Sequence, residues 1–313
     1  MPDPRPIVIT GAAGLAGQNL IPRLKARGMG PLIGIDKHPA NNAIFKKLHP
    51  DVRLVEADLA TDDGWQAALA GAGTLVLCHA QIAALTEAPF TANNVVATER
   101  VLEAARRHGV GQIVHISSSV VNSLAHDFYT ESKKAQEKLA LDSGIPTCVL
   151  RPTLMYGWFD RKHLGWLARF MARTPVFPIP GHGRYLRQPL YVGDFCNIIA
   201  ACIAEPRPGQ VFNISGQEQI AYIDLIRALK EASGAKAAIV RIPYGLFRTL
   251  LQLYAVVDSN PPFTVSQLAA LVVPETFEVI DWPRLFGVKS TPILEGLRET
   301  FQDPVYSRVV LEF

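Results

Sequence analysis

The sequence predicts an α/β protein built on a doubly wound parallel sheet, and three observations support this fold class. Short apolar runs alternate with amphipathic stretches over the first half of the chain. The first run leads into a glycine-rich turn, and later runs end in polar residues. The runs expected to form strands are 7–10, 31–35, 53–57, 74–78, 112–116 and 146–150, with a further strand at 211–214. Such alternation favours parallel strands joined by right-handed helical crossovers.

Length and composition limit the classes of protein to consider. With 313 residues, of which 49% are hydrophobic, the chain can form one large or two interlocked domains. The net charge of +3 is small and scattered, so it gives no support for nucleic-acid binding. Four cysteines without metal or disulfide spacing suit a reducing compartment, so we expect a cytoplasmic location and no metal. No signal core and no uninterrupted membrane-spanning apolar run are evident.

The glycine-rich turn that follows the first predicted strand reads Gly11-Ala-Ala-Gly14-Leu15-Ala16-Gly17 and leads into a helix. A strand, a glycine-rich turn and a helix in this order begin a dinucleotide-binding unit. Gly11 would permit the tight turn, Gly14 would let a pyrophosphate approach the backbone, and Gly17 would let helix and strand pack closely. The helix start also offers unpaired amides and a positive dipole end to phosphates.

Asp36 ends the second predicted strand, about twenty residues beyond the glycine turn. An acidic residue there can accept hydrogen bonds from both ribose hydroxyls and would repel a 2′-phosphate, so NAD is favoured over NADP. Lys37 and His38 follow directly and could soften that preference. The alternative interpretation of Asp36 is a loop-forming aspartate.

Polar residues also follow the next three predicted strands, where the carboxyl edge of a parallel sheet binds ligands. They are Asp58 after the third strand, His79-Ala80-Gln81 after the fourth, and Ser117-Ser118-Ser119 after the fifth.

Tyr129 and Lys133 lie four residues apart at the start of a predicted helix that ends near Gly144. This spacing places both side chains on one face. A free tyrosine has a pKa of about 10, too high for a base at neutral pH, and a nearby cation lowers it. Such a pair can move a proton to or from a carbinol oxygen. The alternative is an ordinary surface helix.

The pattern changes after Arg151, where the strand–helix rhythm is lost. We expect a cofactor-binding domain over 1–155, with 188–213 added to it. A smaller substrate-binding domain, 156–187 and 214–313, would lie over the carboxyl edge of the sheet. The apolar stretch 242–257 is expected to be a packed helix of that domain. The alternative is a surface that faces a partner, a lipid or a membrane.

Taken together, these motifs resemble the extended short-chain dehydrogenase/reductases, and more narrowly the NAD-dependent epimerase/dehydratase family, over about residues 6–215. The resemblance implies a Rossmann-type fold with a smaller C-terminal substrate-binding domain, an NAD cofactor and a homodimer. The cofactor contacts that it implies come from Gly11, Gly14, Leu15, Ala16, Gly17, Asp36, Lys37, Asp58, Leu59, His79, Ala80, Gln81, Asn94, Ser117, Tyr129, Lys133, Pro152 and Thr153.

The same resemblance implies the catalytic roles. Tyr129 would be the acid/base, Lys133 would bind the nicotinamide ribose and lower the pKa of Tyr129, and Ser119 would orient the substrate. Arg187 resembles the arginine that grips a nucleotide diphosphate in sugar-nucleotide members, with a surface arginine as the alternative. Leu154 would line the substrate pocket.

Two departures from the family pattern favour a less polar substrate. Ser119 and Tyr129 are only ten residues apart, which shortens a loop that helps shape the pocket, and Leu154 stands where many sugar-nucleotide members have an asparagine. The predicted function is an NAD-dependent sugar-nucleotide epimerase or keto-reductase with a Ser/Tyr/Lys triad. One alternative is a 3β-hydroxysteroid dehydrogenase-like oxidoreductase of an apolar alcohol or ketone. The other is a non-catalytic cofactor-binding subunit.

Overall fold

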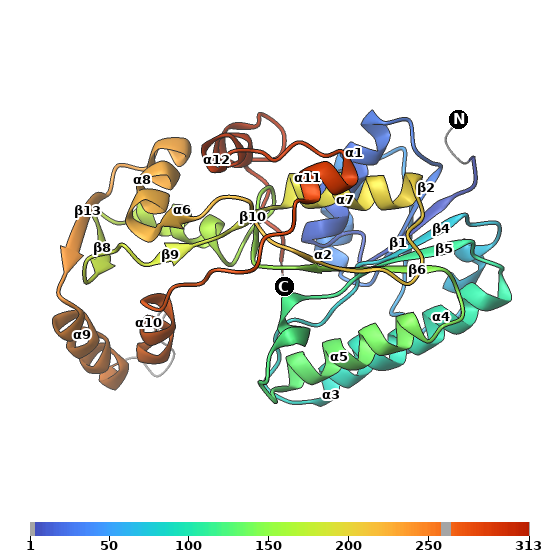
Figure 1. Ribbon diagram of the computed structural model, residues 1–313, viewed down its shortest axis with the longest axis horizontal. Helices are drawn as coiled ribbons and strands as arrows, with labels where there is room; N and C mark the ends of the chain where they lie inside the picture. The colour runs from blue at the N-terminus through green and yellow to red at the C-terminus, as the bar shows by residue number, and fades with distance from the viewer. Residues whose placement is uncertain (1–3, 258–263, 313) are drawn as a thin grey trace.

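The computed structural model describes residues 4–257 and 264–312, which form two lobes (Figure 1). The larger lobe holds a seven-stranded parallel sheet, so the predicted fold class is confirmed. Its strand order is β11-β6-β5-β4-β1-β2-β3. The strands are β1 (Ile7–Thr10), β2 (Leu32–Asp36), β3 (Arg53–Glu56), β4 (Thr74–Leu77), β5 (Gln112–Ile116), β6 (Thr147–Pro152) and β11 (Val211–Ile214).

Strand β1 lies at the centre of the sheet and is buried along its whole length. It pairs in parallel with β2 on one side and β4 on the other, with Ile7 opposite both Leu32 and Thr74. Burial on both faces explains why its sequence is a continuous apolar run rather than an alternating one. The chain reverses its winding direction at β1, and ligands bind outside the carboxyl ends of strands at such a point.

Helices cover both faces of the sheet. Figure 1 shows α1 and α7 on one face and α4 and α5 on the other. The helices of this lobe are α1 (Leu15–Ala26), α2 (Pro39–Leu48), α3 (Ala88–Phe90), α4 (Ala97–Arg107), α5 (Phe128–Leu141) and α7 (Val192–Ala204), with the 3-10 helices η1 (Trp65–Leu69) and η3 (Ser119–Asn122) and the π-helix η2 (Thr91–Val96). One core cluster joins Ile9, Leu20 and Ile199, and another joins Leu75 and Val101.

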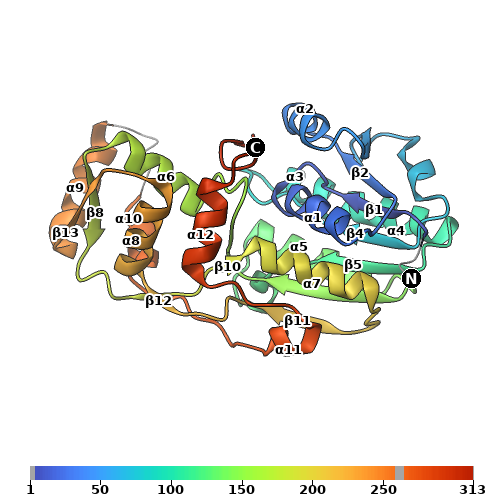
Figure 2. The ribbon, with the colours of Figure 1, turned by 90° about the horizontal axis from the view of Figure 1, so that it is seen from above.

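The smaller lobe extends from the carboxyl ends of β6 and β11, and α12 lies between the two lobes (Figure 2). A third core cluster, which includes Phe177, Leu225 and Leu297, holds it together. Its elements are β7 (Met155–Tyr156), α6 (Leu164–Arg173), β8 (Val176–Pro180), β9 (Leu186–Arg187), β10 (Leu190–Tyr191), β12 (Ile220–Ala221), α8 (Tyr222–Ser233), β13 (Ala238–Ile242), α9 (Tyr244–Val257), α10 (Val265–Leu271) and α12 (Ile293–Gln302). Helix α11 (Trp282–Phe286) instead packs on the larger lobe beside α7 (Figure 1), since Trp282 and Phe286 belong to the core of that lobe. The domain boundaries expected from the sequence stay predictions.

Helix α9 differs from the packed helix expected over 242–257. It forms, but Leu246, Leu250 and Leu253 are 54%, 49% and 61% exposed. These three leucines share one face because they are four and three residues apart. That face is therefore about half exposed, and the expectation of a helix packed in the smaller domain is wrong for this face. Within 4–257 and 264–312, no helix combines the length and apolarity needed to cross a membrane.

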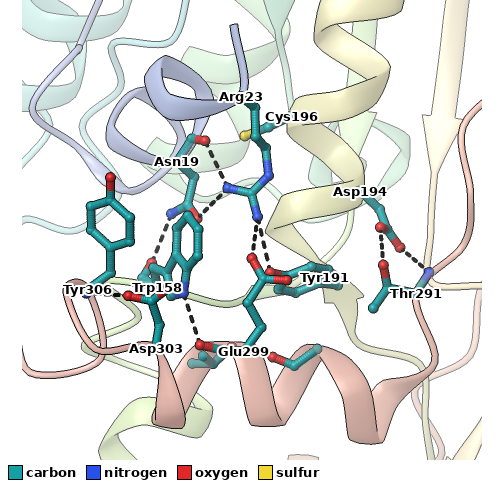
Figure 3. A network of polar contacts seen from close by, with 12 residues as sticks. Asn19, Arg23, Trp158, Tyr191, Asp194, Cys196, Thr291, Glu299, Asp303 and Tyr306 are labelled. Carbon is teal, nitrogen blue, oxygen red and sulfur yellow. Dashed lines mark hydrogen bonds and ion pairs between the residues drawn. The ribbon is translucent and has the colours of Figure 1, made fainter. Parts of the chain in front are cut away.

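A polar network joins α1 to the last helix (Figure 3). The Arg23 guanidinium lies 2.9 Å from the Glu299 carboxylate, donates to the Tyr191 hydroxyl at 3.1 Å, and stacks over the Trp158 ring at 4.5 Å. Farther along the chain, Asn41 of α2 exchanges two hydrogen bonds of 2.8 Å with the backbone of residue 312. The final segment of the described chain is thus bonded to the first two helices.

Candidate active site

Tyr129 lies in the first turn of α5, at the carboxyl end of the sheet. Asp127 caps the helix, since its carboxylate accepts from the Thr130 amide at 2.9 Å. Burial raises the pKa of Tyr129 above its ordinary value, and the nearby Ser118 side chain acts in the opposite direction. The lowered pKa expected from the sequence is therefore not seen in this structure, because desolvation outweighs the other effects.

The structure places Ser118, rather than Ser119, beside Tyr129. Ser118 precedes η3, and its hydroxyl accepts from the Val120 amide at 3.4 Å. Ser119 is the first residue of that turn. The sequence analysis gave no role to Ser118 and chose Ser119, because three consecutive serines give no signal for where β5 ends. The substrate-orienting role of Ser119 stays a prediction.

Lys133 is 1% exposed, one helical turn after Tyr129. Its ammonium donates to the Ile116 carbonyl at 3.0 Å and to the Gln136 amide oxygen at 2.5 Å. Burial lowers the pKa of Lys133 to about 8, while the nearby Glu137 and Cys78 raise it. The side chain is therefore mostly charged at neutral pH.

The glycine turn forms a cradle that side chains would fill. Gly11 has a φ of +65°, and a Cβ there would lie 2.8 Å from the His79 backbone. A Cβ on Gly17 would lie 2.5 Å from the Ala12 carbonyl oxygen. Leu15 begins α1 directly after the cradle. The missing side chains at Gly11 and Gly17 thus let the turn pack closely against the backbone of His79 and Ala12. Binding of a cofactor at this turn stays a prediction.

Asp36 lies against this cradle. Its carboxylate accepts from the Ala13 amide and the His38 amide, each at 3.0 Å. Burial raises the pKa of Asp36, and these backbone bonds oppose the shift. Lys37 turns to other partners, since its ammonium lies 2.8 Å from the Asp58 carboxylate and 2.6 Å from the Asn93 amide oxygen.

Several other residues predicted to contact the cofactor form hydrogen bonds within the protein. Asn94, fully buried, accepts from the Gln81 amide at 2.6 Å and donates to the Ser132 hydroxyl at 2.9 Å. Ser117 donates to the Glu137 carboxylate at 2.5 Å. Thr153 differs, because its hydroxyl is buried and has no hydrogen-bond partner among the described residues. A buried orphan hydroxyl at the end of β6 fits a ligand that is absent here. Of the remaining predicted contacts, Ala16 lies in α1, Leu59 follows Asp58, Ala80 is exposed after β4, and Pro152 ends β6.

Arg187, predicted to grip a diphosphate, is instead bonded to backbone carbonyls. It is 9% exposed and donates to Leu186 at 3.0 Å, to Val273 at 2.8 Å and to Leu271. Its guanidinium thus holds the 271–273 segment against β9. Leu154, the other substrate residue predicted from the sequence, lies between β6 and β7 and accepts a backbone bond from Leu190 at 3.0 Å.

The chain is similar to curated enzymes of several kinds, including a dehydratase and a dehydrogenase/isomerase. It is 28% identical to a dTDP-glucose 4,6-dehydratase of Streptomyces griseus over 259 residues, which cover 73% of this chain and 79% of that enzyme. It is also 28% identical to a 3 beta-hydroxysteroid dehydrogenase/Delta 5-->4-isomerase of Mycobacterium tuberculosis over 269 residues, which cover 75% of this chain and 71% of that enzyme.

A solved structure and a family comparison agree with the fold. The UDP-glucuronic acid 4-epimerase of Bacillus cereus, solved in complex with NAD, superposes with a TM-score of 0.70 at 20% identity and covers 94% of each chain. Residues 7–215 match the model of the NAD dependent epimerase/dehydratase family. This match spans the glycine cradle, Asp36, Tyr129 and Lys133. The chain therefore belongs to the NAD dependent epimerase/dehydratase family.

Proposed function

We propose that this protein moves a proton and a hydride at a carbinol or carbonyl carbon, as an NAD-dependent oxidoreductase or epimerase. The observation that carries the proposal is the position of Tyr129, whose hydroxyl lies near Ser118 and one helical turn from the buried Lys133. Tyr129 takes or gives the proton at the substrate oxygen, and Ser118 holds that oxygen in place with it. Lys133 supplies positive charge that favours the phenolate.

The residues around this pair fit NAD. Gly11 and Gly17 let the turn fold tightly against the His79 and Ala12 backbone, Asp36 lies beside the turn, and the orphan hydroxyl of Thr153 lies directly after β6. Bound NAD would supply the hydride acceptor or donor. We propose NAD rather than NADP because the Asp36 carboxylate would repel a 2′-phosphate. The homodimer and the cytoplasmic location stay predictions.

Exchange of Asp36 for asparagine is expected to weaken NAD binding and to lower the ratio of NAD affinity to NADP affinity. Hydrogen bonds to a charged acceptor contribute about 1.5–3 kcal/mol, so loss of the charge should lower NAD affinity by about tenfold or more. Calorimetric titration of NAD and NADP into both proteins measures this change. Asp224→Asn, at an exposed position of α8, is the control. An unchanged ratio of the two affinities would exclude Asp36 from cofactor selection.

For the substrate, we propose an apolar secondary alcohol or ketone. The Arg187 guanidinium donates its hydrogen bonds to backbone carbonyls, so it is poorly placed to bind a diphosphate. Exposed apolar side chains surround the start of α5 instead: Phe128 is 48% exposed and Leu124 is 92% exposed. The buried ring of Phe90 packs 6.4 Å from both Phe128 and Tyr129. The similar 3β-hydroxysteroid enzyme, by its name, acts on an apolar alcohol.

A nucleotide sugar is the second candidate, favoured by the similar dTDP-glucose dehydratase. Calorimetry of UDP and dTDP with the NAD-saturated protein separates the two. If the substrate is apolar, neither nucleotide binds at micromolar concentration, and hydroxysteroids or other apolar alcohols generate NADH absorbance. Micromolar nucleotide binding would favour the sugar candidate, and product analysis of sugar panels would follow because epimerisation leaves absorbance unchanged.

Replacement of Arg187 with alanine is expected to lower stability rather than nucleotide affinity. The variant loses the hydrogen bonds from the guanidinium to Leu186, Leu271 and Val273, and hydrogen bonds to a charged group contribute about 1.5–3 kcal/mol. Thermal unfolding should show the loss, whereas Arg184→Ala, at an exposed neighbouring position, should leave the melting temperature nearly unchanged. A variant of normal stability that loses tight UDP binding would contradict this assignment of Arg187.

A further inference from the structure

Gln136 contacts the ammonium of Lys133 from the next turn of α5 and is fully buried. Its amide oxygen accepts from Lys133 at 2.5 Å. Its amide nitrogen donates to the Thr98 hydroxyl at 3.0 Å and to the His79 carbonyl at 3.2 Å. Both ends of the amide are therefore engaged. The opposite orientation would direct an NH₂ group at an ammonium and an oxygen at a carbonyl, so this orientation is fixed.

The chain of hydrogen bonds continues from Thr98 to the central strand. The Thr98 hydroxyl lies 3.0 Å from His79 Nε2, and His79 Nδ1 lies 2.7 Å from the Thr10 hydroxyl. Thr10 in turn donates to the Val76 carbonyl at 3.4 Å. Burial, together with the charge of Lys133, lowers the pKa of His79 to about 3, so its ring is neutral at ordinary pH.

A neutral ring gives this chain one consistent direction. Gln136 donates to the Thr98 oxygen, Thr98 donates to His79 Nε2, and His79 Nδ1–H donates to the Thr10 oxygen. Each donor in the chain then has an acceptor, and the Gln136 amide oxygen remains free to accept a hydrogen bond from the Lys133 ammonium. Aligned hydrogen bonds polarise one another, which strengthens the bond at the end of the chain.

We propose that Gln136 is a positioning residue for Lys133: its amide oxygen, oriented by the chain through Thr98 and His79, fixes the ammonium near the end of β5 and favours its charged form. The importance of that charge for turnover rests on the function proposed for the Tyr129 and Lys133 pair. The positioning itself can be measured without turnover.

Other titratable groups face Lys133 and have to be separated from Gln136. Glu137 raises the pKa of Lys133, but its carboxylate is also bonded to Ser117 and paired with Arg151. Burial keeps His115 and His79 neutral by lowering their pKa values. The titratable groups that act on or respond to the ammonium from α5, β5 and the segment after β4 are Glu137, His115, Cys78 and His79.

The test follows the titration of Lys133 by NMR in protein labelled with carbon-13 at the lysine ε position. The Lys133 signal is assigned by its loss in Lys133→Arg. In Gln136→Leu, the charged form loses an acceptor, so the pKa of Lys133 is expected to fall by about one unit from its wild-type value. In Gln136→Glu, a carboxylate replaces the amide, so the pKa is expected to rise. Thr98→Val, which removes an anchor of Gln136 but keeps its oxygen, should give a smaller fall.

Gln112→Leu is the matched control, since Gln112 bonds Thr74 and the Ile203 carbonyl and not Lys133. It should leave the Lys133 titration unchanged. If Gln136→Leu has a lower melting temperature but the pKa of Lys133 is unchanged, Gln136 contributes only packing. That result would overturn the proposal. A shift in the same direction in the Leu and Glu variants would overturn it as well. If Gln136→Leu does not fold, the Thr98→Val and Gln136→Glu titrations decide the outcome by the same criterion. If the wild-type protein is inactive with every substrate screened, that result counts against the proposed function. The pKa of Lys133 measured by NMR still tests the positioning role of Gln136.

Discussion

Replacement of Tyr129 with phenylalanine is expected to reduce turnover by about 10²–10⁴-fold, the usual contribution of a positioned acid/base group, while NAD still binds. The phenol is the group that the structure places beside Ser118 and one turn from the Lys133 ammonium. Phenylalanine keeps the ring packing against Phe90 but removes the proton that is transferred. Turnover is measured with the substrate found in the screen, and NAD binding by calorimetry.

The pH dependence of the same reaction has an expected sign. Burial raises the pKa of Tyr129, so alcohol oxidation, which needs the phenolate, should become faster as the pH rises. The charge of Lys133 is lost above about pH 8 in the described state, which opposes this gain.

For the Tyr129→Phe substitution, Tyr244→Phe, at an exposed position of α9, is the control for turnover. Unchanged turnover in Tyr129→Phe would remove Tyr129 from the mechanism and favour the non-catalytic alternative.

Replacement of Gly17 with alanine is expected to destabilise the protein and to weaken NAD binding together. The added Cβ would lie 2.5 Å from the Ala12 carbonyl oxygen and 2.6 Å from its Cα, so the backbone of the cradle has to shift. Overpacking of this kind costs about 1–3 kcal/mol, and a shift of the cradle displaces the amides that would face the pyrophosphate. A loss of NAD affinity of about tenfold or more is expected.

Gly245→Ala is the matched control for that substitution, because Gly245 also lies in a helix and a Cβ there would meet nothing within 4 Å. Alanine should be neutral or stabilise α9 by about 0.5–1 kcal/mol, the difference in helix propensity. Thermal unfolding and calorimetry are run on both variants. Equal melting temperatures and equal NAD affinities in Gly17→Ala and Gly245→Ala would show that the close approach at Gly17 affects neither the stability of the protein nor NAD binding.

The sheet could be predicted because its strands have a local signal. Strands buried on both faces, such as β1, are short apolar runs, and the glycine turn follows β1 directly. The same holds for α5, whose amphipathic pattern and Asp127 cap are encoded within one segment. These elements depend on neighbours in the sequence, so periodicity finds them.

Much of the candidate site could not be predicted, because it depends on partners far apart in the sequence. Arg187 was expected to hold a diphosphate, but it bonds carbonyls 84 and 86 residues away, which no local pattern indicates. Gln136 was overlooked because its partner Thr98 lies on another helix, 38 residues earlier. Ser118 was passed over in favour of Ser119 because the choice depends on the backbone direction after β5, which composition does not encode.

The bonds between the first helices and the last described segment also bear on how the protein is made. Arg23 and Asn41 leave the ribosome early, whereas Glu299 and the backbone of residue 312 are added hundreds of residues later. All seven strands of the main sheet, which end at Ile214, are synthesised before these partners exist. During translation the larger lobe therefore forms without the Arg23–Glu299 ion pair and without the two hydrogen bonds of Asn41. Both are added only when a segment made much later folds back onto α1 and α2.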